Sequence, residues 1–194
     1  MDTLEEKRSS AAKTISFMMA LTLVGKVLGL YRDRLLAVHY STGAAASAFF
    51  TASRIPRVFF DAVFASAIAA CFIPVYSEFL EKKGKEEANR FAGCFITAIA
   101  LLTGAFTLLG MAFPQPFVAA FADYADPQTT ALAVSLTRVM FPTVLFSGIA
   151  FSLVGVLQAQ DHFTAPALMS AVSNTVIILY FFTLDVRLGI FGLA

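Results

Sequence analysis

Residues 139–184 decide the fold of this chain. They read VMFPTVLFSGIAFSLVGVLQAQ over 139–160, then Asp161 and His162, then FTAPALMSAVSNTVIILYFFTL over 163–184. Each run has 22 residues and no Asp, Glu, Lys or Arg. A helix of about 20 apolar residues crosses the hydrocarbon core of a bilayer, and lipid leaves an open segment no other way to satisfy its backbone. The stretch therefore predicts two transmembrane helices joined by a short polar turn.

The composition of the whole chain agrees with a membrane location. Of its 194 residues, 58% are hydrophobic and 14% are charged, against about 45–50% and about 25% in soluble domains. Residues 91–113 form a third charge-free run of 23 residues. The net charge of +1 gives no basic excess, so the sequence does not indicate a nucleic-acid-binding protein.

The expected fold is an all-α polytopic membrane protein, with residues 1–194 forming one transmembrane lobe. In the first eighty residues we expect two long helices separated by a turn at 41–43, the second bending around Pro56. Residues 114–127 are expected at the outer interface, with Phe117 and Phe121 in lipid and Tyr124 among the headgroups. We interpret the 21 Phe residues as lipid-facing bulk. The predicted spans are 12–38, 44–78, 91–113, 131–158 and 164–184, with the start of a sixth at 188–194.

The distribution of basic residues predicts the orientation. The segments on the side of the N-terminus hold seven of them, and the opposite loops hold only Arg187. Loops rich in Lys and Arg stay in the cytoplasm, so the N-terminus is predicted to be cytoplasmic. The seven basic residues on the N-terminal side are Lys7, Arg8, Lys13, Lys82, Lys83, Lys85 and Arg90.

A cleaved signal peptide is disfavoured. Residues 46–48 resemble a cleavage site, but four charges and a turn separate them from the first apolar run.

Ionisable residues lie inside the second predicted span. Arg54, Arg57 and Asp61 are spaced i, i+3 and i+7, which places them on one helix face. Arg57 and Asp61 are four residues apart and can neutralise each other. Charges at membrane depth usually face a bundle interior or a wet cavity.

The first predicted span also carries charges. Lys26 and Asp33 share a face, whereas Arg32 and Arg34 point to other sides. Arg34 is expected to reach the outer headgroups. Lys26 and Arg54 lie too deep for that, so we expect them to line an aqueous or anion-binding cavity; structural pairing with Asp33 or Asp61 is the alternative.

The later spans contain four further polar residues of interest. Arg138 is either an anchor near the outer leaflet or a cavity residue. Ser170, Ser173 and Asn174 can hydrogen-bond across helices, and we expect them to pack in the core of the bundle.

The sequence does not indicate an enzyme. His39 and His162 are more than a hundred residues apart, and Cys71 and Cys94 lie in apolar runs. Gly-rich phosphate loops and nucleophile elbows are absent from the sequence. We therefore expect no catalytic residues, no metal and no cofactor.

Several blocks of sequence resemble a known family. Residues 25–33, GKVLGLYRD, are similar to the S-R-V-L-G-x-x-R-D signature in the first helix of the MviN/MurJ lipid II flippases, members of the multidrug/oligosaccharidyl-lipid/polysaccharide exporter superfamily. Residues 48–50 (AFF), 54–56 (RIP) and 70–78 (ACFIPVYSE) resemble the second helix of that family, and residues 140–142 (MFP) its fourth.

The resemblance implies a fold and a function. It implies most of the first lobe of a two-lobed flippase in the bacterial cytoplasmic (inner) membrane, with the second lobe missing from this sequence. Such a protein moves an undecaprenyl-diphosphate-linked saccharide, lipid II, to the outer leaflet by alternating access for peptidoglycan synthesis, which maintains the cell wall and cell shape. Basic residues in the cavity of the family bind the diphosphate. The residues expected to do so here are Lys26, Arg32, Arg54 and Arg57, with Asp33 and Asp61 as charge partners.

The chain departs from the family pattern at several positions. Ser47 stands where the family has an acidic residue, and Phe60 and Asp61 stand where it has two arginines. Ala65 replaces the glutamate of its A-E-G-A block. Two alternatives therefore remain beside a lipid II flippase: a flippase for another lipid-linked oligosaccharide, and a structural membrane protein without transport activity.

Overall fold

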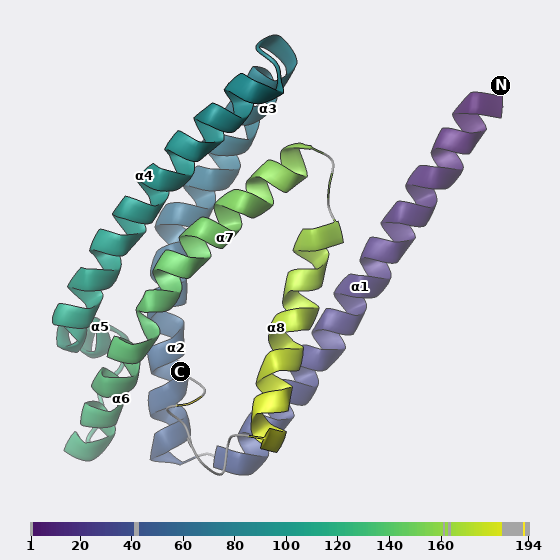
Figure 1. Cartoon of the computed structure of the whole chain (residues 1–194). Coiled ribbons are helices and arrows are strands. Elements are labelled where there is room, and N and C mark those ends of the chain that lie inside the picture. The colour runs from purple at the N-terminus through teal and green to yellow at the C-terminus, as the bar shows by residue number, and fades with distance from the viewer. Residues whose placement is uncertain (1, 41–42, 161, 163, 184–191, 193–194) are drawn as a thin grey trace.

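The computed structural model describes residues 2–40, 43–160, 162, 164–183 and 192, with side chains from residue 16 onward except 165–167. The regular elements in this part of the chain are helices (Figure 1). The predicted turn at 41–43 and the predicted start of a sixth span at 188–194 lie largely outside the described residues. The helices are α1 (Asp2–Tyr40), α2 (Ala44–Phe59), η1 (Phe60–Ala65), η2 (Ile68–Phe72), α3 (Ile73–Lys82), α4 (Lys85–Ala112), α5 (Pro114–Phe121), α6 (Pro127–Met140), α7 (Pro142–Ala159) and α8 (Thr164–Thr183).

Long apolar helices confirm an all-α polytopic membrane protein. Three continuous helical segments are long and apolar enough to cross a bilayer: Ala44–Lys82, Lys85–Ala112 and Pro127–Ala159. A shorter apolar helix covers Leu168–Thr183. The boundaries of the membrane itself stay predictions.

The helices run alternately up and down between two ends of the molecule (Figure 1). The start of α1, the turn between α3 and α4, the end of α7 and the start of α8 lie at one end. The short helix α5 and the turn before α6 lie at the opposite end. Helix α8 packs along α1, while α2 packs on α6 and α4 packs on α7. The described chain therefore has an α1–α8 pair beside a larger body formed by α2 to α7.

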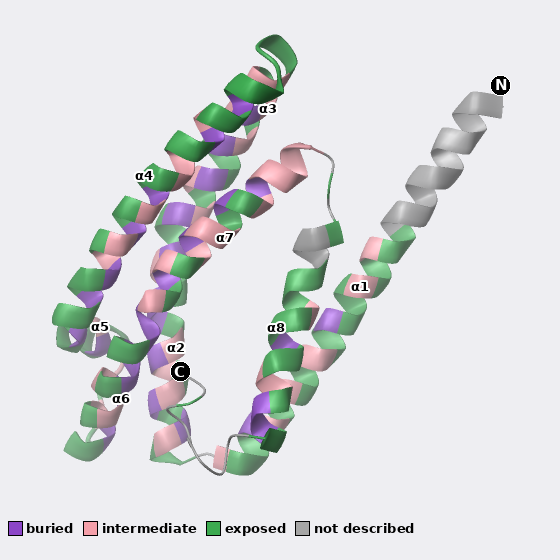
Figure 2. Ribbon diagram, viewed as in Figure 1, coloured by how far each residue is buried: buried purple, intermediate pink, exposed green. Residues whose placement is uncertain are grey.

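Aromatic side chains fill the core of the larger body. Phe60, Phe72 and Phe141 are buried, and the purple faces of the helices in Figure 2 turn toward one another. Phe117 lies 5.3 Å from Phe59 and 5.2 Å from Phe141 between ring centroids. The interpretation of Phe as lipid-facing bulk is therefore wrong for these residues, and Phe117 packs against the core rather than standing free of it. Aromatic rings bury large apolar areas and prefer such offset or edge-to-face contacts, which suits them to the space between helices.

The long helix from Ala44 to Lys82 changes its winding after Pro56. The helix continues through Pro56, which lies inside α2 and is buried. The backbone N–H of Phe60 is shared between the carbonyls of Arg57 and Pro56, and a π-helical segment begins at Phe60. Proline lacks an N–H and disturbs the regular ladder. Two π-helical segments follow Pro56, which the sequence pattern did not indicate, and the bend stays a prediction.

Polar contacts fix the two ends of the larger body. At one end, the Tyr76 hydroxyl donates to Asn89 Oδ1 (3.1 Å) and accepts from Gln160 Nε2 (2.7 Å), which joins α3, α4 and α7. At the other end, the Tyr124 hydroxyl lies 2.6 Å from Thr51 Oγ1 and donates to the carbonyl of Ser47.

Asp126 caps the first turn of α6. Its carboxylate accepts from Thr129 Oγ1 (2.7 Å) and from the backbone N–H groups of Gln128 and Thr129. These bonds to the ionised form, the Thr129 hydroxyl first, hold the pKa of Asp126 below its usual value. The cap satisfies backbone donors that a helix start leaves free.

A glycine sets the distance between α4 and the α6–α7 junction. A Cβ added at Gly110 would collide with the ring of Phe141, which is fully buried. Gly93 on the same helix has open space around it. We expect Gly110→Ala to destabilise the protein by about 1–3 kcal/mol through overpacking. Gly93→Ala should leave stability unchanged or raise it, because alanine favours the helix. Thermal unfolding of the purified full-length protein checks this, and an equal response of the two variants would contradict the packing described here.

Candidate functional site: a polar cavity between α2, α7 and α8

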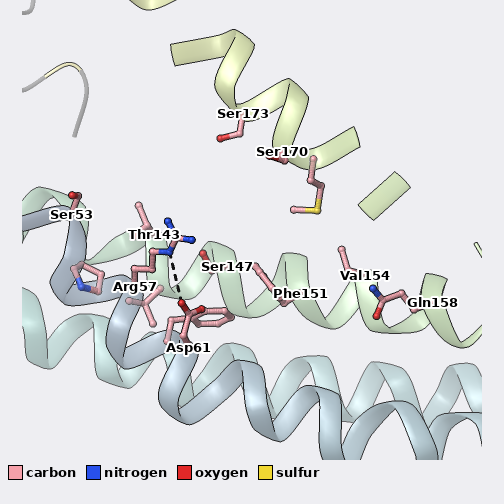
Figure 3. A pocket seen from close by; sticks show the side chains of 14 residues that line it. Ser53, Arg57, Asp61, Thr143, Ser147, Phe151, Val154, Gln158, Ser170 and Ser173 are labelled. Carbon is pink, nitrogen blue, oxygen red and sulfur yellow. Dashed lines mark ion pairs between the residues drawn. The ribbon is translucent and has the colours of Figure 1, made fainter. Parts of the chain in front are cut away.

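A cavity lies between α8 and the larger body. Its volume is about 610 Å³. Helices α2, η1 and α7 line one side, and α8 lies opposite them in Figure 3. The lining is mixed: its polar residues are Ser53, Arg57, Asp61, Thr143, Ser147, Gln158, Ser170 and Ser173, and its apolar residues are Pro56, Phe60, Val144, Phe151, Val154 and Met169.

Arg57 and Asp61 provide the charge of the cavity. Arg57 Nε lies 3.7 Å from Asp61 Oδ2, as predicted from their i, i+4 spacing. The Arg57 side chain is 82% exposed and that of Asp61 57% exposed in the described chain. Both side chains point toward the space between the helices (Figure 3). The pair therefore stands in an accessible position, and water weakens the attraction of such a pair.

The facing walls carry uncharged polar groups. Ser147 and Gln158 come from α7, and Ser170 and Ser173 come from α8. The side chains of these four residues have no hydrogen-bond partner among the described residues. Ser170 and Ser173 are exposed rather than packed in the core as expected. Unpaired hydroxyl and amide groups are costly in lipid, and their position in a hollow leaves them accessible to water or a ligand.

The α1–α8 pair is held by a close approach of backbones. A Cβ at Gly25 would lie 3.1 Å from Ser170 Oγ, and a Cβ at Gly29 would lie 3.4 Å from Asn174 Nδ2. Small residues four apart allow membrane helices to approach closely. Asn174 is buried and donates from Nδ2 to the carbonyl of Gly25 (2.9 Å). The expected hydrogen bond across helices is confirmed for Asn174.

Arg32 belongs to the same seam. Its Nη1 donates to Asn174 Oδ1 at 2.9 Å, and its Nε and Nη2 donate to Asp33 Oδ1 at 3.0 and 2.8 Å. The Arg32 side chain is 33% exposed. Asp33 is thus a charge partner of Arg32, and Arg32 links the charge of α1 to α8.

Lys26 and Arg54 are exposed and have no hydrogen bond or ion pair with the described residues. The suggested pairing with Asp33 or Asp61 is not observed, because those acids contact Arg32 and Arg57. Lys26 borders a second, shallower hollow of about 440 Å³ along α1. Of the four residues predicted to bind substrate, Arg57 lines the large cavity in this structure.

Arg138 lies in the last turn of α6, and its side chain contacts the C-terminal end of α4. Its Nε donates to the carbonyl of Met111 at 3.1 Å. The partial negative charge at the C-terminal end of a helix stabilises a cation in this position. Arg138 is not among the lining residues of the cavity. Within the described part of the chain, His, Cys, Asp and Glu do not gather in groups of three that could hold a metal ion.

The fold and the cavity are those of an all-α, multi-pass membrane protein with a polar cavity between its helices. A sequence model described as "Lipid II flippase MurJ" matches residues 36–194. The chain belongs to the lipid II flippase MurJ family.

Individual relatives agree with this assignment. The chain is 30% identical to the "Probable lipid II flippase MurJ" of Bdellovibrio bacteriovorus over 183 residues, 92% of this chain and 35% of the relative. It is 30% identical to the "Lipid II flippase MurJ" of Thermosipho africanus over 178 residues, which are 91% of this chain and 36% of the relative. It is 29% identical to the "Lipid II flippase MurJ" of Burkholderia cenocepacia over 159 residues, which are 81% of this chain and 31% of the relative. The chain thus spans about a third of the length of these relatives.

The sequence pattern missed the neutral part of the site. Ser147 and Gln158 lie in the charge-free run that predicted a transmembrane helix, and their polarity did not alter that prediction. One signal in the sequence could have indicated these residues. Ser147, Val154 and Gln158 are spaced i, i+7 and i+11, so the Ser147 hydroxyl and the Gln158 amide lie on the same helix face, with the apolar Val154 between them.

The Asn174 contacts generate a prediction for the α1–α8 seam. Asn174→Ala removes a donor to Gly25 and an acceptor from Arg32, so we expect a loss of about 1–3 kcal/mol of stability. Thr175→Ala is the matched control, because the exposed Thr175 hydroxyl bonds only to its own helix at Ala171 among the described residues. Thermal unfolding of both variants in the same lipid decides the point. A seam that does not depend on Asn174 would give equal melting temperatures.

Proposed function

We propose that this chain is the first lobe of a flippase that moves a lipid-linked peptidoglycan precursor, lipid II, from the inner to the outer leaflet. The observation that carries the proposal is the polar cavity of about 610 Å³ between α2, α7 and α8 in a member of this family. A polar hollow between membrane helices gives a hydrophilic headgroup a path that lipid does not.

Arg57 is the residue proposed to meet the diphosphate first. Its guanidinium is exposed to the cavity, and arginine binds phosphate through paired, charge-assisted hydrogen bonds. The hydroxyls of Ser147, Ser170 and Ser173 face the same space. They offer donors and acceptors suited to the hydroxyl and amide groups of a saccharide.

Lys26, Arg32 and Arg54 are proposed to complete the basic site during transport. Lys26 and Arg54 are exposed and without a partner in the described chain, so an anion can bind them without breaking an ion pair. Arg32 sits on the seam that joins α1 to α8, so movement of this pair relative to α2 would carry Arg32 and Lys26 with it. Alternating access by rocking of one lobe against another requires the second lobe.

The proposed location is the bacterial cytoplasmic membrane, with the N-terminus in the cytoplasm. Lys82, Lys83 and Lys85 flank the α3–α4 turn, at the same end as the start of α1. The positive-inside rule supports this orientation.

A second function is favoured by one observation. Asp61 places an acid beside Arg57 in the cavity, which makes the described lining neutral overall. A flippase for a different lipid-linked oligosaccharide, with a less anionic headgroup, fits such a cavity.

Complementation tests the proposal. The full-length protein is expressed in bacteria depleted of their own lipid II flippase, as wild type and as Lys26→Ala, Arg32→Ala, Arg54→Ala and Arg57→Ala. We expect the wild type to restore growth and cell shape, and each variant to restore it less at equal membrane levels, because each loses a cation for the diphosphate.

The exposed Lys83 near the α3–α4 turn gives the matched control, Lys83→Ala, which should rescue like the wild type. A well-expressed wild type that fails to rescue contradicts lipid II transport. Rescue by the wild type and all four variants alike contradicts the basic site.

A further inference from the structure

The charged lining of the cavity consists of one pair of opposite charges. Among the lining residues, Arg57 and Asp61 are the charged ones. Their formal charges cancel, so an anionic ligand entering this cavity meets a cation that already has a partner. The strength of that partnership therefore decides how well the cavity binds an anion.

The Arg57–Asp61 contact is a loose one. It joins Nε to Oδ2 at 3.7 Å, whereas the Arg32–Asp33 and Lys82–Glu78 contacts are both 2.8 Å. A carboxylate that holds arginine firmly does so through two parallel hydrogen bonds. In this geometry the two Nη groups of Arg57 remain available to a second anion while Asp61 stays close.

The backbone places the pair at a change of helical winding. Arg57 lies in the last turn of α2, directly after Pro56, and Asp61 lies in the first turn of the π-helical η1. Single π-helical turns are frequent at functional sites. Both side chains leave this junction toward the cavity (Figure 3), so the junction presents the acid and the base side by side to the same space.

We propose that Asp61 acts as an internal competitor for Arg57 and sets the affinity of the cavity for a diphosphate. In the empty cavity the Asp61 carboxylate lies beside the guanidinium, 3.7 Å from Nε. A diphosphate binds Arg57 through the free Nη groups, and Asp61, which stays close, weakens the pull of the cation and repels the bound anion. This inference rests on the proposed function, and it gives a carrier what it needs: binding strong enough to load and weak enough to release.

Direct binding measurements test the role of Asp61. The full-length protein is placed in phosphatidylcholine nanodiscs and titrated with undecaprenyl diphosphate, and separately with inorganic pyrophosphate, which distinguishes a lipid-linked from a free diphosphate. The variants are Asp61→Asn, Asp61→Ser, Arg57→Gln and the double variant Arg57→Gln/Asp61→Asn. Glu78→Gln is the matched control, since Glu78 forms an i, i+4 pair with Lys82 on α3, outside the cavity lining.

Asp61→Asn and Asp61→Ser are expected to tighten undecaprenyl diphosphate binding about 3- to 10-fold, as expected for removing one nearby like charge in a wet site. Arg57→Gln should weaken binding of undecaprenyl diphosphate. Adding Asp61→Asn to this variant should restore little of the lost affinity, because the guanidinium on which Asp61 acts is then absent. Glu78→Gln should bind like the wild type.

Unchanged binding in both folded Asp61 variants, alongside weaker binding in Arg57→Gln, overturns the inference and leaves the proposed function standing. Tightening by Glu78→Gln to the same extent also overturns it, because the effect would then be one of net charge. Absence of any binding by the wild type overturns this inference together with the proposed site.

Discussion

The structure depends on one constraint: a polar group between membrane helices must find a partner, because lipid supplies none. Asn174 shows how the constraint shapes the fold. Its side chain bonds to the Gly25 carbonyl and to Arg32, and the glycines of α1 let α8 come close enough for both bonds. The same constraint leaves Ser147, Ser170 and Ser173 facing a hollow, since they have no partner in the described chain. Packing and cavity are thus two solutions to one problem.

The two bodies of the described chain differ in how they are held. Polar bonds and small residues join α1 to α8, whereas aromatic rings and the Tyr76 contacts join α2 to α7. Packing between α7 and α8 is limited compared with that between α1 and α8, and the cavity lies in this less tightly packed region. Two separately held bodies with a cavity between them can move relative to each other without losing their own cores.

The sequence predicted the fold class and the charged residues, but not the arrangement around them. Charge-free runs and the solvent properties of lipid indicated the helices directly, and the i, i+4 spacing indicated the Arg57–Asp61 pair. The aromatic core was misread, because a Phe facing lipid and a Phe facing another helix satisfy the same hydropathy pattern. The π-helical segments were not predictable, since they depend on how Pro56 and its neighbours pack. Which charges share a cavity depends on tertiary contacts such as Arg32 with Asn174, which no local spacing encodes. The binding roles of Lys26, Arg32, Arg54 and Arg57 stay predictions.

The central claim is that water reaches the space between α2, α7 and α8. The most direct test labels single cysteines with a charged, membrane-impermeant thiol reagent in open membrane fragments, after Cys71 and Cys94 have been replaced by serine. Ser147→Cys and Ser170→Cys probe the cavity, and Leu108→Cys on the outer face of α4 is the control, because Leu108 is exposed in the described chain and is not a lining residue. The account predicts fast labelling at positions 147 and 170, slowed by bound undecaprenyl diphosphate, and little labelling at 108. Equal protection of all three positions would contradict a wet cavity.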